Sequence, residues 1–224
     1  SLPGVQIETF APGQPLGRID VQCPLMGLPV LFGTEVGSVP ARIPYLSAIP
    51  SEVEAWRQRL EALPGRKVGL VWAGSARPDQ PDAALVDRRR SMRLTELSRL
   101  AEVAGITFVS LQKGPPSDQV SGTRHGLPIV DWTDELHDFA DTAALIEALD
   151  LTICVDTSVV HLVGALGKPV WMLDRIDHCW RWLVGREDSP WYPTMRIFRQ
   201  TEPGDWAGVV ARVVPALKDW VGQT

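Results

Sequence analysis

The chain has 224 residues, of which 45% are apolar and 22% charged, a composition typical of a globular protein with a sizeable core. Its net charge is −5 and its isoelectric point is near 5.4, which argues against broad binding to nucleic acid or to an anionic membrane surface. The negative charge therefore predicts no nucleic-acid partner. No run of about 18 uninterrupted apolar residues occurs, so we also expect no transmembrane segment.

The cysteines and the first residues indicate the cellular compartment of the protein. Cys23, Cys154 and Cys179 are too few and too scattered for a disulfide framework, which favours a reducing cytoplasm. The opening residues SLPG have neither a charged region nor an apolar region of the kind found in signal peptides. They also lack an initiator Met and open in mid-pattern, which suggests a fragment or a processed chain.

Residues 1–50 are rich in proline and show little helical periodicity. Residues 5–10 have the pattern of a strand, and residues 24–32 that of a short helix broken at Pro29. Such a segment can hardly bury a core by itself. We therefore interpret 1–50 as the remnant of a larger domain, or as a strap over the next one.

An alternation of helices and strands begins at residue 51. Ser51 and Glu54 fit a capping box, which predicts a helix over 51–62. Apolar runs then predict strands at 67–73, 107–111, 128–130, 151–155, 170–173 and 195–198. Helices are predicted at 94–103, 139–149, 159–166 and 206–221. The pattern is typical of an α/β fold, with a Rossmann-like doubly wound parallel sheet over 51–224 and all strand-end loops on one rim.

The turn formed by Asp156, Thr157 and Ser158 is the strongest local signal for function. It joins a buried strand to a helix, and a helix start beyond a strand's carboxyl end favours anions. Asp156 or Thr157 could instead simply cap the helix. His161 lies four residues after Thr157 and therefore over the same helix face, either as a packing residue or as a ligand contact. We predict a phosphate-bearing ligand at residues 156–161.

Two other strand-end loops carry candidate contacts. The first predicted strand ends near Ser75, and the long loop after it, 76–92, brings an arginine cluster at 88–93. At least two of these arginines are expected to be merely solvated, while a guanidinium such as that of Arg90 can grip a diphosphate. The second strand is followed by Lys113, which is either a surface lysine or a point charge for phosphate.

The remaining polar and aromatic clusters are less informative. The tryptophans of 180–183 and 188–193 can pin a crossover to the sheet or stack on a sugar or base. Asp174, Asp177, His178 and Cys179 match no usual ligand spacing, so no metal is expected. The sequence contains no P-loop, G-x-G-x-x-G, nucleophile elbow or C-x-x-C motif.

Several blocks together resemble a known family. They are VGLVWAGS (68–75), RRRSMRL (88–94), FVSLQKGP (108–115), ICVDTSVVHLVGALGKPVWML (153–173) and WRWLVGREDSPWYPTMRIFRQ (180–200), and IDVQCPLMGLP (19–29) also matches. The chain resembles the carboxyl-terminal region of bacterial tetratricopeptide-repeat glycosyltransferases, which are related to the heptosyltransferase-like glycosyltransferase family 9 with the GT-B fold. The resemblance runs over nearly the whole chain.

The resemblance implies a metal-independent, cofactor-free transfer of a sugar from a nucleotide diphosphate sugar to a protein or glycan acceptor. The donor diphosphate would lie on Asp156, Thr157, Ser158 and His161, with Ser75, Arg90 and Lys113 across the rim. Residues 51–224 would be the donor-binding half, and 1–50 a remnant of the acceptor-side domain, which usually supplies the catalytic base. The base stays unidentified, and the chain alone can be inactive. The alternatives are a non-catalytic nucleotide-binding or interaction module and a nucleotide-sugar epimerase.

Overall fold

The computed structural model describes residues 13–14, 17–121 and 126–223, and the chain divides into two compact units, Ser1–Val39 and Pro40–Thr224. The first unit holds the 3₁₀ helices η1 (Leu25–Gly27) and η2 (Val36–Ser38) and the α-helix α1 (Leu28–Leu31). None of these three elements contains a buried residue. The helix predicted over 24–32 is two short helices that meet at Leu28, next to Pro29, which stands in the first turn of α1. The strand expected over 5–10 lies outside the described residues.

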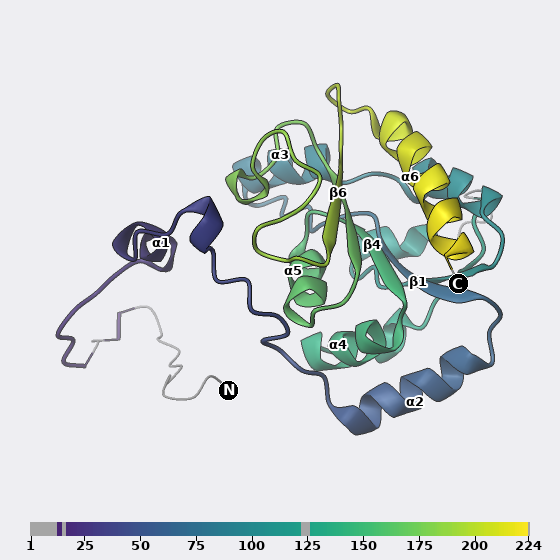
Figure 1. Ribbon diagram of the computed structural model, residues 1–224, viewed down its shortest axis with the longest axis horizontal. Helices are drawn as coiled ribbons and strands as arrows, with labels where there is room; N and C mark the ends of the chain where they lie inside the picture. The colour runs from purple at the N-terminus through teal and green to yellow at the C-terminus, as the bar shows by residue number, and fades with distance from the viewer. Residues whose placement is uncertain (1–12, 15–16, 122–125, 224) are drawn as a thin grey trace. The chain divides into compact units, whose positions relative to one another are not determined.

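The second unit contains a parallel sheet of six strands (Figure 1). The strands are β1 (Arg66–Val71), β2 (Ile106–Ser110), β3 (Ile129–Val130), β4 (Leu151–Val155), β5 (Val170–Asp174) and β6 (Met195–Arg199). Their order is β3-β2-β1-β4-β5-β6, and every neighbouring pair is parallel. This confirms the predicted α/β fold with a Rossmann-like doubly wound parallel sheet.

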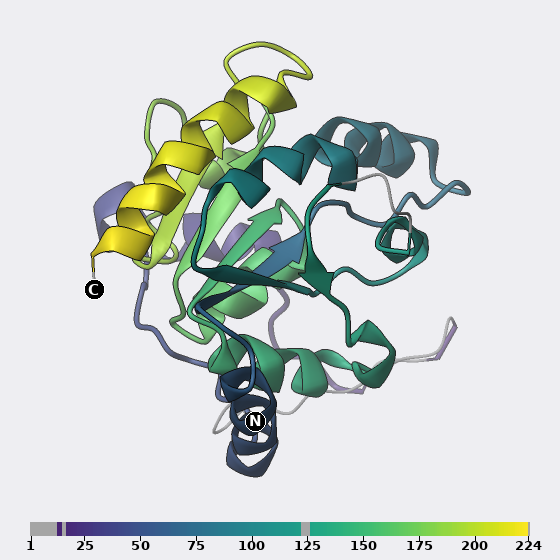
Figure 2. The ribbon, with the colours of Figure 1, turned by 90° about the vertical axis from the view of Figure 1, so that its right-hand side faces the viewer.

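Helices cover both faces of the sheet (Figure 2). One face carries the 3₁₀ helix η3 (Leu94–Glu102) and the long α6 (Trp206–Gly222), and the other carries α2 (Pro50–Glu61), α4 (Phe139–Ala148) and α5 (Ser158–Ala165). Four further short helices lie in connections: α3 (Pro81–Arg90), η4 (Pro115–Gln119), η5 (Thr133–Glu135) and η6 (Trp180–Trp182). The sheet is thus the middle layer of three.

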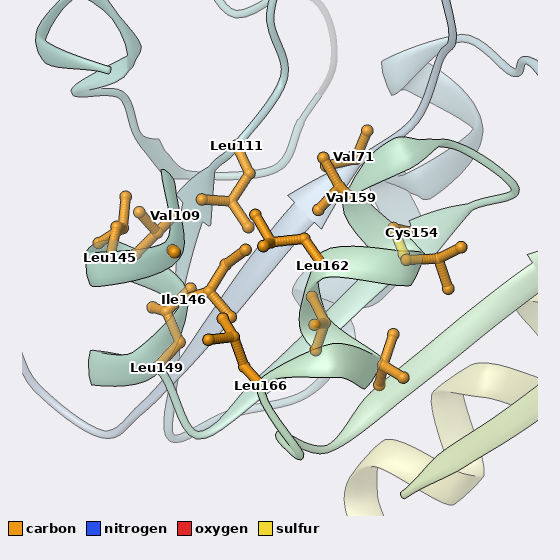
Figure 3. Close-up of a cluster of buried hydrophobic side chains, with 14 of the residues drawn as sticks. Val71, Val109, Leu111, Leu145, Ile146, Leu149, Cys154, Val159, Leu162 and Leu166 are labelled. Atoms are coloured by element: carbon orange, nitrogen blue, oxygen red, sulfur yellow. The ribbon is translucent and has the colours of Figure 1, made fainter. Parts of the chain in front are cut away.

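Each face of the sheet has its own hydrophobic core. Figure 3 shows part of the core under α4 and α5, where Leu145, Ile146 and Leu162 pack against Val71 and Val109 of the strands. Residues of β4 are buried along the whole strand, because neighbouring side chains alternate between the two cores. Strands buried on both faces explain why the sequence shows unbroken apolar runs at these positions.

Helix α2 begins one residue before the predicted helix, with Pro50 in its first turn and Ile49 at its N-cap. No side chain caps this helix, so the predicted capping box of Ser51 and Glu54 is not formed. Proline has a fixed φ close to the helical value and lacks the N–H that would have no partner at that position. Pro50 therefore starts the helix without a capping side chain.

The predicted loop 76–92 contains a helix, α3, and the prediction of an irregular connection there is wrong. Pro81 stands in its first turn and Arg88, Arg89 and Arg90 in its last, where cations offset the negative end of the helix dipole. Among its residues only Asp87 is buried, so the segment lacks the apolar periodicity that predicts a helix.

The helix predicted over 94–103 is a 3₁₀ helix over Leu94–Glu102. Its buried residues Leu94, Leu97 and Leu100, and Val103 just after them, recur every three residues. A 3₁₀ helix has three residues per turn, so this spacing places all four on one line. The prediction of a helix here is confirmed, and the structure adds its type.

Both edges of the sheet are short or covered. β3 has two residues. Along β6, the N–H of Ile197 donates to the carbonyl of Glu187 at 2.6 Å, and Asp188 forms an antiparallel bridge with Arg196. Residues 187–188 therefore lie along the outer side of β6.

Candidate functional site

A cavity of about 760 Å³ opens at the carboxyl ends of the central strands. The chain builds β1, β2 and β3 outwards in one direction and then returns to place β4 on the other side of β1. Open α/β sheets hold ligands at such a switch point. The cavity is lined by residues 73–78, 111–116 and 157–159, together with Val71, Asp87, Arg90, Ser91, Met92, Gln119, Phe139 and Thr142. Its volume suits a ligand of nucleotide size.

Gln112 ties together two of the loops that line the cavity. Its side-chain oxygen accepts the N–H groups of Trp72 (3.0 Å) and Ala73 (2.8 Å), and its amide nitrogen donates to the carbonyls of Ala73 (3.0 Å) and Lys113 (2.9 Å). Gln112 is buried, and all of these bonds cross between the ends of β1 and β2 or close the turn after β2. The walls on either side of Gln112 are therefore held at a fixed separation.

Arg90 lines the cavity from the end of α3, as part of a buried ion pair. Its Nε donates to Asp87 at 3.0 Å and its Nη1 to the main-chain carbonyl of Asp156 at 3.1 Å. The side chains of Arg90 and Asp87 are 18% and 9% exposed. Gly74 lies against this pair, and a Cβ at Gly74 would overlap both side chains. Arg90 thus joins the loop after β1 to the turn after β4.

The turn after β4 carries a buried hydroxyl that has no hydrogen-bond partner, on a residue that lines the cavity. Thr157 is the N-cap residue of α5, but its side chain makes no capping hydrogen bond. Its Oγ1 is buried and has no hydrogen-bond partner, which is costly without a ligand. Thr157 and Ser158 both line the cavity, beside the first N–H groups of α5, which have no partner inside the helix. The sequence left open whether this turn only caps the helix, and Thr157 does not cap it.

Ser75 and Lys113 also lie where the sequence placed them, on the rim of the cavity. Ser75 is exposed at the loop after β1. The Lys113 ammonium donates to the carbonyl of Thr133 at 2.6 Å, and Lys113 is therefore anchored to the loop before α4. It brings a positive charge to the cavity wall.

His161 and the side chain of Asp156 do not line the cavity. The His161 ring is half-buried on the far side of α5, where it stacks on Trp182 with centroids 5.3 Å apart. Its Nδ1 lies 3.0 Å from the hydroxyl of Tyr192. Burial lowers the pKa of His161, an effect that the Asp156 carboxylate opposes and Arg181 reinforces. The structure thus brings Ser75, Arg90, Lys113, Thr157 and Ser158 together and sets His161 one helical turn away.

Arg77 and Phe139 are among the cavity residues that the sequence analysis did not single out. Arg77 is exposed on the cavity wall with φ +40°, and its guanidinium has no partner among the described residues. A positive φ at a residue other than glycine often marks a functional position, but no sequence pattern reveals it. Phe139 is 59% exposed at the start of α4. Its exposure at a helix start could not be distinguished from core packing in the sequence.

A second buried ion pair lies farther along the same rim, at the end of β5. The Asp174 carboxylate accepts from Arg199 Nε at 2.9 Å, and its other oxygen, Oδ1, has no partner. Burial raises the pKa of Asp174 to about 6, against the opposing effect of Arg199. Within the described residues no group of three or more His, Cys, Asp or Glu side chains is placed to hold a metal ion. Nor does that part of the chain contain a helix that could cross a membrane.

Comparisons with known proteins show the fold. No family model matches the chain. The protein FlbA of Caulobacter vibrioides is 32% identical over 187 residues, which are 81% of this chain and 30% of FlbA. The ADP-heptose lps heptosyltransferase II of E. coli covers 84% of the chain with a TM-score of 0.57 and 15% identity. A family 9 glycosyl transferase of Veillonella parvula also covers 84%, with a TM-score of 0.54 and 13% identity.

The chain spans only part of each of these proteins: 30% of FlbA, 56% of the E. coli enzyme and 57% of the Veillonella protein. At 13 to 15% identity the solved structures show the fold alone. The chain therefore has a heptosyltransferase-like, Rossmann-like fold of the kind found in glycosyltransferases, as its sequence motifs predicted.

Proposed function

We propose that this chain is the donor-binding half of a metal-independent GT-B glycosyltransferase, and that its cavity holds the diphosphate of a nucleotide diphosphate sugar. The observation that carries the proposal is the buried, unpaired hydroxyl of Thr157 on the cavity wall, at the start of α5. A phosphate oxygen there would satisfy the hydroxyl and the first N–H groups of the helix together.

The charges around the cavity support an anionic ligand. Arg77, Arg90 and Lys113 bring three cations to its walls, and Asp87 is the one carboxylate among its lining residues. Because Asp87 is paired with Arg90, the net charge facing a ligand is positive in a chain whose overall charge is −5. Without a metal, cations and helix N–H groups would have to stabilise the charge that develops on the leaving diphosphate.

Among the described residues, the same cavity wall offers no general base. Its lining residues include no histidine, and their one carboxylate, that of Asp87, is committed to Arg90. This favours an arrangement in which the acceptor-side domain supplies the catalytic base. In this proposal residues 51–224 bind the donor and 1–50 belong to the acceptor side, while the tetratricopeptide repeats and the protein or glycan acceptor stay predictions from the resemblance.

The test is a calorimetric panel of UDP, ADP, GDP and their sugar conjugates against the wild-type chain and Thr157→Val. At least one nucleotide diphosphate should bind the wild type. The valine variant should bind it about 10-fold to 100-fold more weakly, the range expected for losing a hydrogen bond to a charged group. Absence of binding across the panel, or equal affinity in the two proteins, would contradict the proposed site.

A non-catalytic nucleotide-binding module is the second candidate, and the lack of a free carboxylate on the cavity wall favours it. Incubation of the longest natural form of the protein with the best-bound sugar nucleotide separates the two, with products followed by NMR. Transfer or slow donor hydrolysis supports the transferase, and binding without turnover supports the module. Interconversion of the sugar without an acceptor would instead indicate an epimerase.

A further inference from the structure

Another cavity, of about 480 Å³, lies at the outer edge of the sheet, along β6. Its lining comes from three parts of the chain: residues 185–187, residues 196–201 of β6 and the turn after it, and Arg212 of α6. None of these described residues lines the cavity that we propose to hold the donor. The two cavities are therefore separate.

The lining of this second cavity is strongly basic. Among its described residues are four arginines, Arg186, Arg196, Arg199 and Arg212, and one carboxylate, that of Glu187. The whole chain has a net charge of −5, so the sign of the charge is reversed here. Because guanidinium groups bind phosphate and carboxylate oxygens through directed N–H groups, this lining favours an anion.

Arg199 and Arg212 differ in what they can offer to a ligand. Arg199 Nε donates to the buried carboxylate of Asp174 at 2.9 Å, and its Nη2 donates to the carbonyl of Trp182 at 3.1 Å. Arg199 is thus committed to the protein. Arg212 donates to the main-chain carbonyl of Arg199, and among the described residues no carboxylate lies within ion-pair distance of it. The positive charge of Arg212 is therefore uncompensated.

Arg186 and Arg196 pair with carboxylates that are exposed to solvent. Arg186 donates to Asp188 through Nε and Nη2, at 2.7 Å each, and the Asp188 side chain is 68% exposed. Arg196 Nη2 lies 3.5 Å from Glu187, whose side chain is 77% exposed. Ion pairs with exposed carboxylates contribute little free energy, so a doubly charged ligand can displace either carboxylate.

Gln200, which lines the same cavity, carries a buried donor without a partner. Its side-chain oxygen accepts the N–H groups of Ile176 at 3.4 Å and Gly204 at 3.3 Å. Because both neighbours are donors, the oxygen end of the amide must face them. The amide nitrogen Nε2 is buried and has no hydrogen-bond partner. A buried donor without an acceptor is costly, and an oxygen of a bound anion would supply the acceptor.

A neighbouring cavity gives a ligand room beyond its anionic group. This space of about 410 Å³ is also lined by Arg196 and Arg212, together with Trp171 and Trp220. The two arginines therefore belong to both cavities. An anionic group bound by them would leave space on the side of the tryptophans for the rest of a small organic molecule.

The positions of the cations favour phosphate over a carboxylate. Arg186 comes from the segment beside β6, Arg196 from the strand itself and Arg212 from α6. A phosphate group has at least three free oxygens that point in different directions, so guanidinium groups from three elements can each bind one. A carboxylate has two oxygens in one plane, which a single guanidinium can bind by itself.

We propose that this cavity binds a phosphate group, with Arg186, Arg196 and Arg212 as its cations and Gln200 as a neutral donor. The ligand chemistry is that of a dianionic phosphate, either inorganic phosphate or a small phosphomonoester whose uncharged part lies in the neighbouring cavity. The site goes beyond the proposed function, since it shares no lining residue with the donor cavity.

The experiment is a ¹H–¹⁵N NMR titration of the labelled chain with inorganic phosphate, with glucose 1-phosphate and with acetate, at constant ionic strength. Both phosphates should give saturable shifts of the backbone signals of Gly185, Ile197 and Arg212, which line the cavity. The signals of Thr157 and Ser158, in the donor cavity, report separately on that site. Absence of saturable shifts at the first group, or equal affinity for acetate, would overturn the proposal.

The source of the phosphate follows from the side-chain N–H signals of Trp171 and Trp220. A shift of these signals with glucose 1-phosphate, and not with inorganic phosphate, supports a phosphomonoester. Saturable binding of both ligands without that shift supports inorganic phosphate as the ligand.

The variants Arg196→Gln and Arg212→Gln should each weaken phosphate binding about 10-fold, the loss expected for a hydrogen bond to a charged group. The matched control is Arg57→Gln, because Arg57 is an exposed arginine of α2 that does not line the cavity. Equal weakening in the control would show a general charge effect and refute the site.

Gln200→Glu keeps an oxygen for the two main-chain N–H groups and replaces the unpaired donor with a second oxygen. It should abolish phosphate binding, with thermal unfolding as the check that the variant is folded. Unchanged affinity in a folded Gln200→Glu chain would refute the contact with Gln200.

Discussion

Because the Thr157 hydroxyl has no partner in the protein, the effect of Thr157 on ligand binding can be measured apart from its effect on the unfolding free energy. If Thr157 served as a helix cap, replacing it with valine would cost about 1 kcal/mol of unfolding free energy. Because its Oγ1 is buried without a partner, Thr157→Val should instead leave the unfolding free energy unchanged within about 0.5 kcal/mol, or raise it. Urea denaturation of the ligand-free protein measures this.

The matched control is Thr142, another threonine on the cavity wall. Its hydroxyl donates to the carbonyl of Asp138 at 2.8 Å, so Thr142→Val should cost about 1 kcal/mol. Equal losses in the two valine variants would show that the Thr157 hydroxyl has a structural partner after all.

Asp174 is expected to make the unfolding free energy depend on pH. Its pKa is raised to about 6 in the folded protein against 3.8 for an ordinary aspartate, so the folded state holds its proton more tightly. The contribution of Asp174 to stability is then greatest below pH 4, falls as the pH rises to 6 and is constant above. Asp174→Asn should remove that slope, which amounts to roughly 2 to 3 kcal/mol between pH 4 and 6. Parallel pH profiles of the two proteins, from denaturant unfolding, would contradict the assignment.

At the scale of the element, α3 depends on one ion pair rather than on a buried apolar face. Arg90→Ala leaves the Asp87 carboxylate, whose side chain is 9% exposed, without its cation and removes the link to Asp156. Breaking a buried pair in this way costs about 3 to 5 kcal/mol. We expect that loss in urea denaturation, and faster hydrogen exchange in α3.

Arg88→Ala is the control for this variant, since Arg88 is an exposed arginine of the same helix without a partner among the described residues. It should change stability by less than about 0.5 kcal/mol. The double variant Asp87→Asn with Arg90→Ala should recover part of the loss, because no buried charge remains unpaired. A loss in the Arg88 variant equal to that in the Arg90 variant would point to the helix dipole instead of the ion pair.

The elements that the sequence predicted well are those whose signal is local. β4 matches its predicted bounds of 151–155, because a strand buried on both faces is an uninterrupted apolar run between turn residues. α3 was missed because its stability depends on Arg90 and Asp156, which are 66 residues apart. The helix of η3 was predicted nearly within its bounds, without its 3₁₀ type.

The sequence predicted part of the candidate site as well. Ser75, Arg90, Lys113, Thr157 and Ser158 follow from the rule that strand ends share one rim, and the structure gathers them. Gln112 was not predicted, because nothing local distinguishes a glutamine that bonds to residues 39 and 40 positions away. His161 does share a helix with Thr157, but its direction is set by Trp182 and Tyr192 from a later loop.

At the scale of the whole molecule, ligand binding should appear as stability. A nucleotide diphosphate at about 100 times its dissociation constant adds about 2.7 kcal/mol to the unfolding free energy. For a domain of this size that corresponds to a rise in Tm of roughly 5 to 10 °C. A thermal-shift titration should show it, with inorganic sulfate as the control for non-specific anion effects. A rise equal to that of sulfate at the same concentration would argue against a nucleotide site.

The covered edge of β6 affects how this protein can associate with other chains. The free hydrogen-bonding groups of an exposed strand edge can pair with a strand of another chain, and domain swapping and fibre growth begin in this way. Here the outward N–H of Ile197 is already bound by Glu187, and β3 at the opposite edge has two residues. A visiting strand would find few unoccupied hydrogen-bonding groups on either side. Among the described residues the two edges of this sheet thus favour strand addition little, so we expect a copy or partner to dock on the sheet domain mainly through side chains.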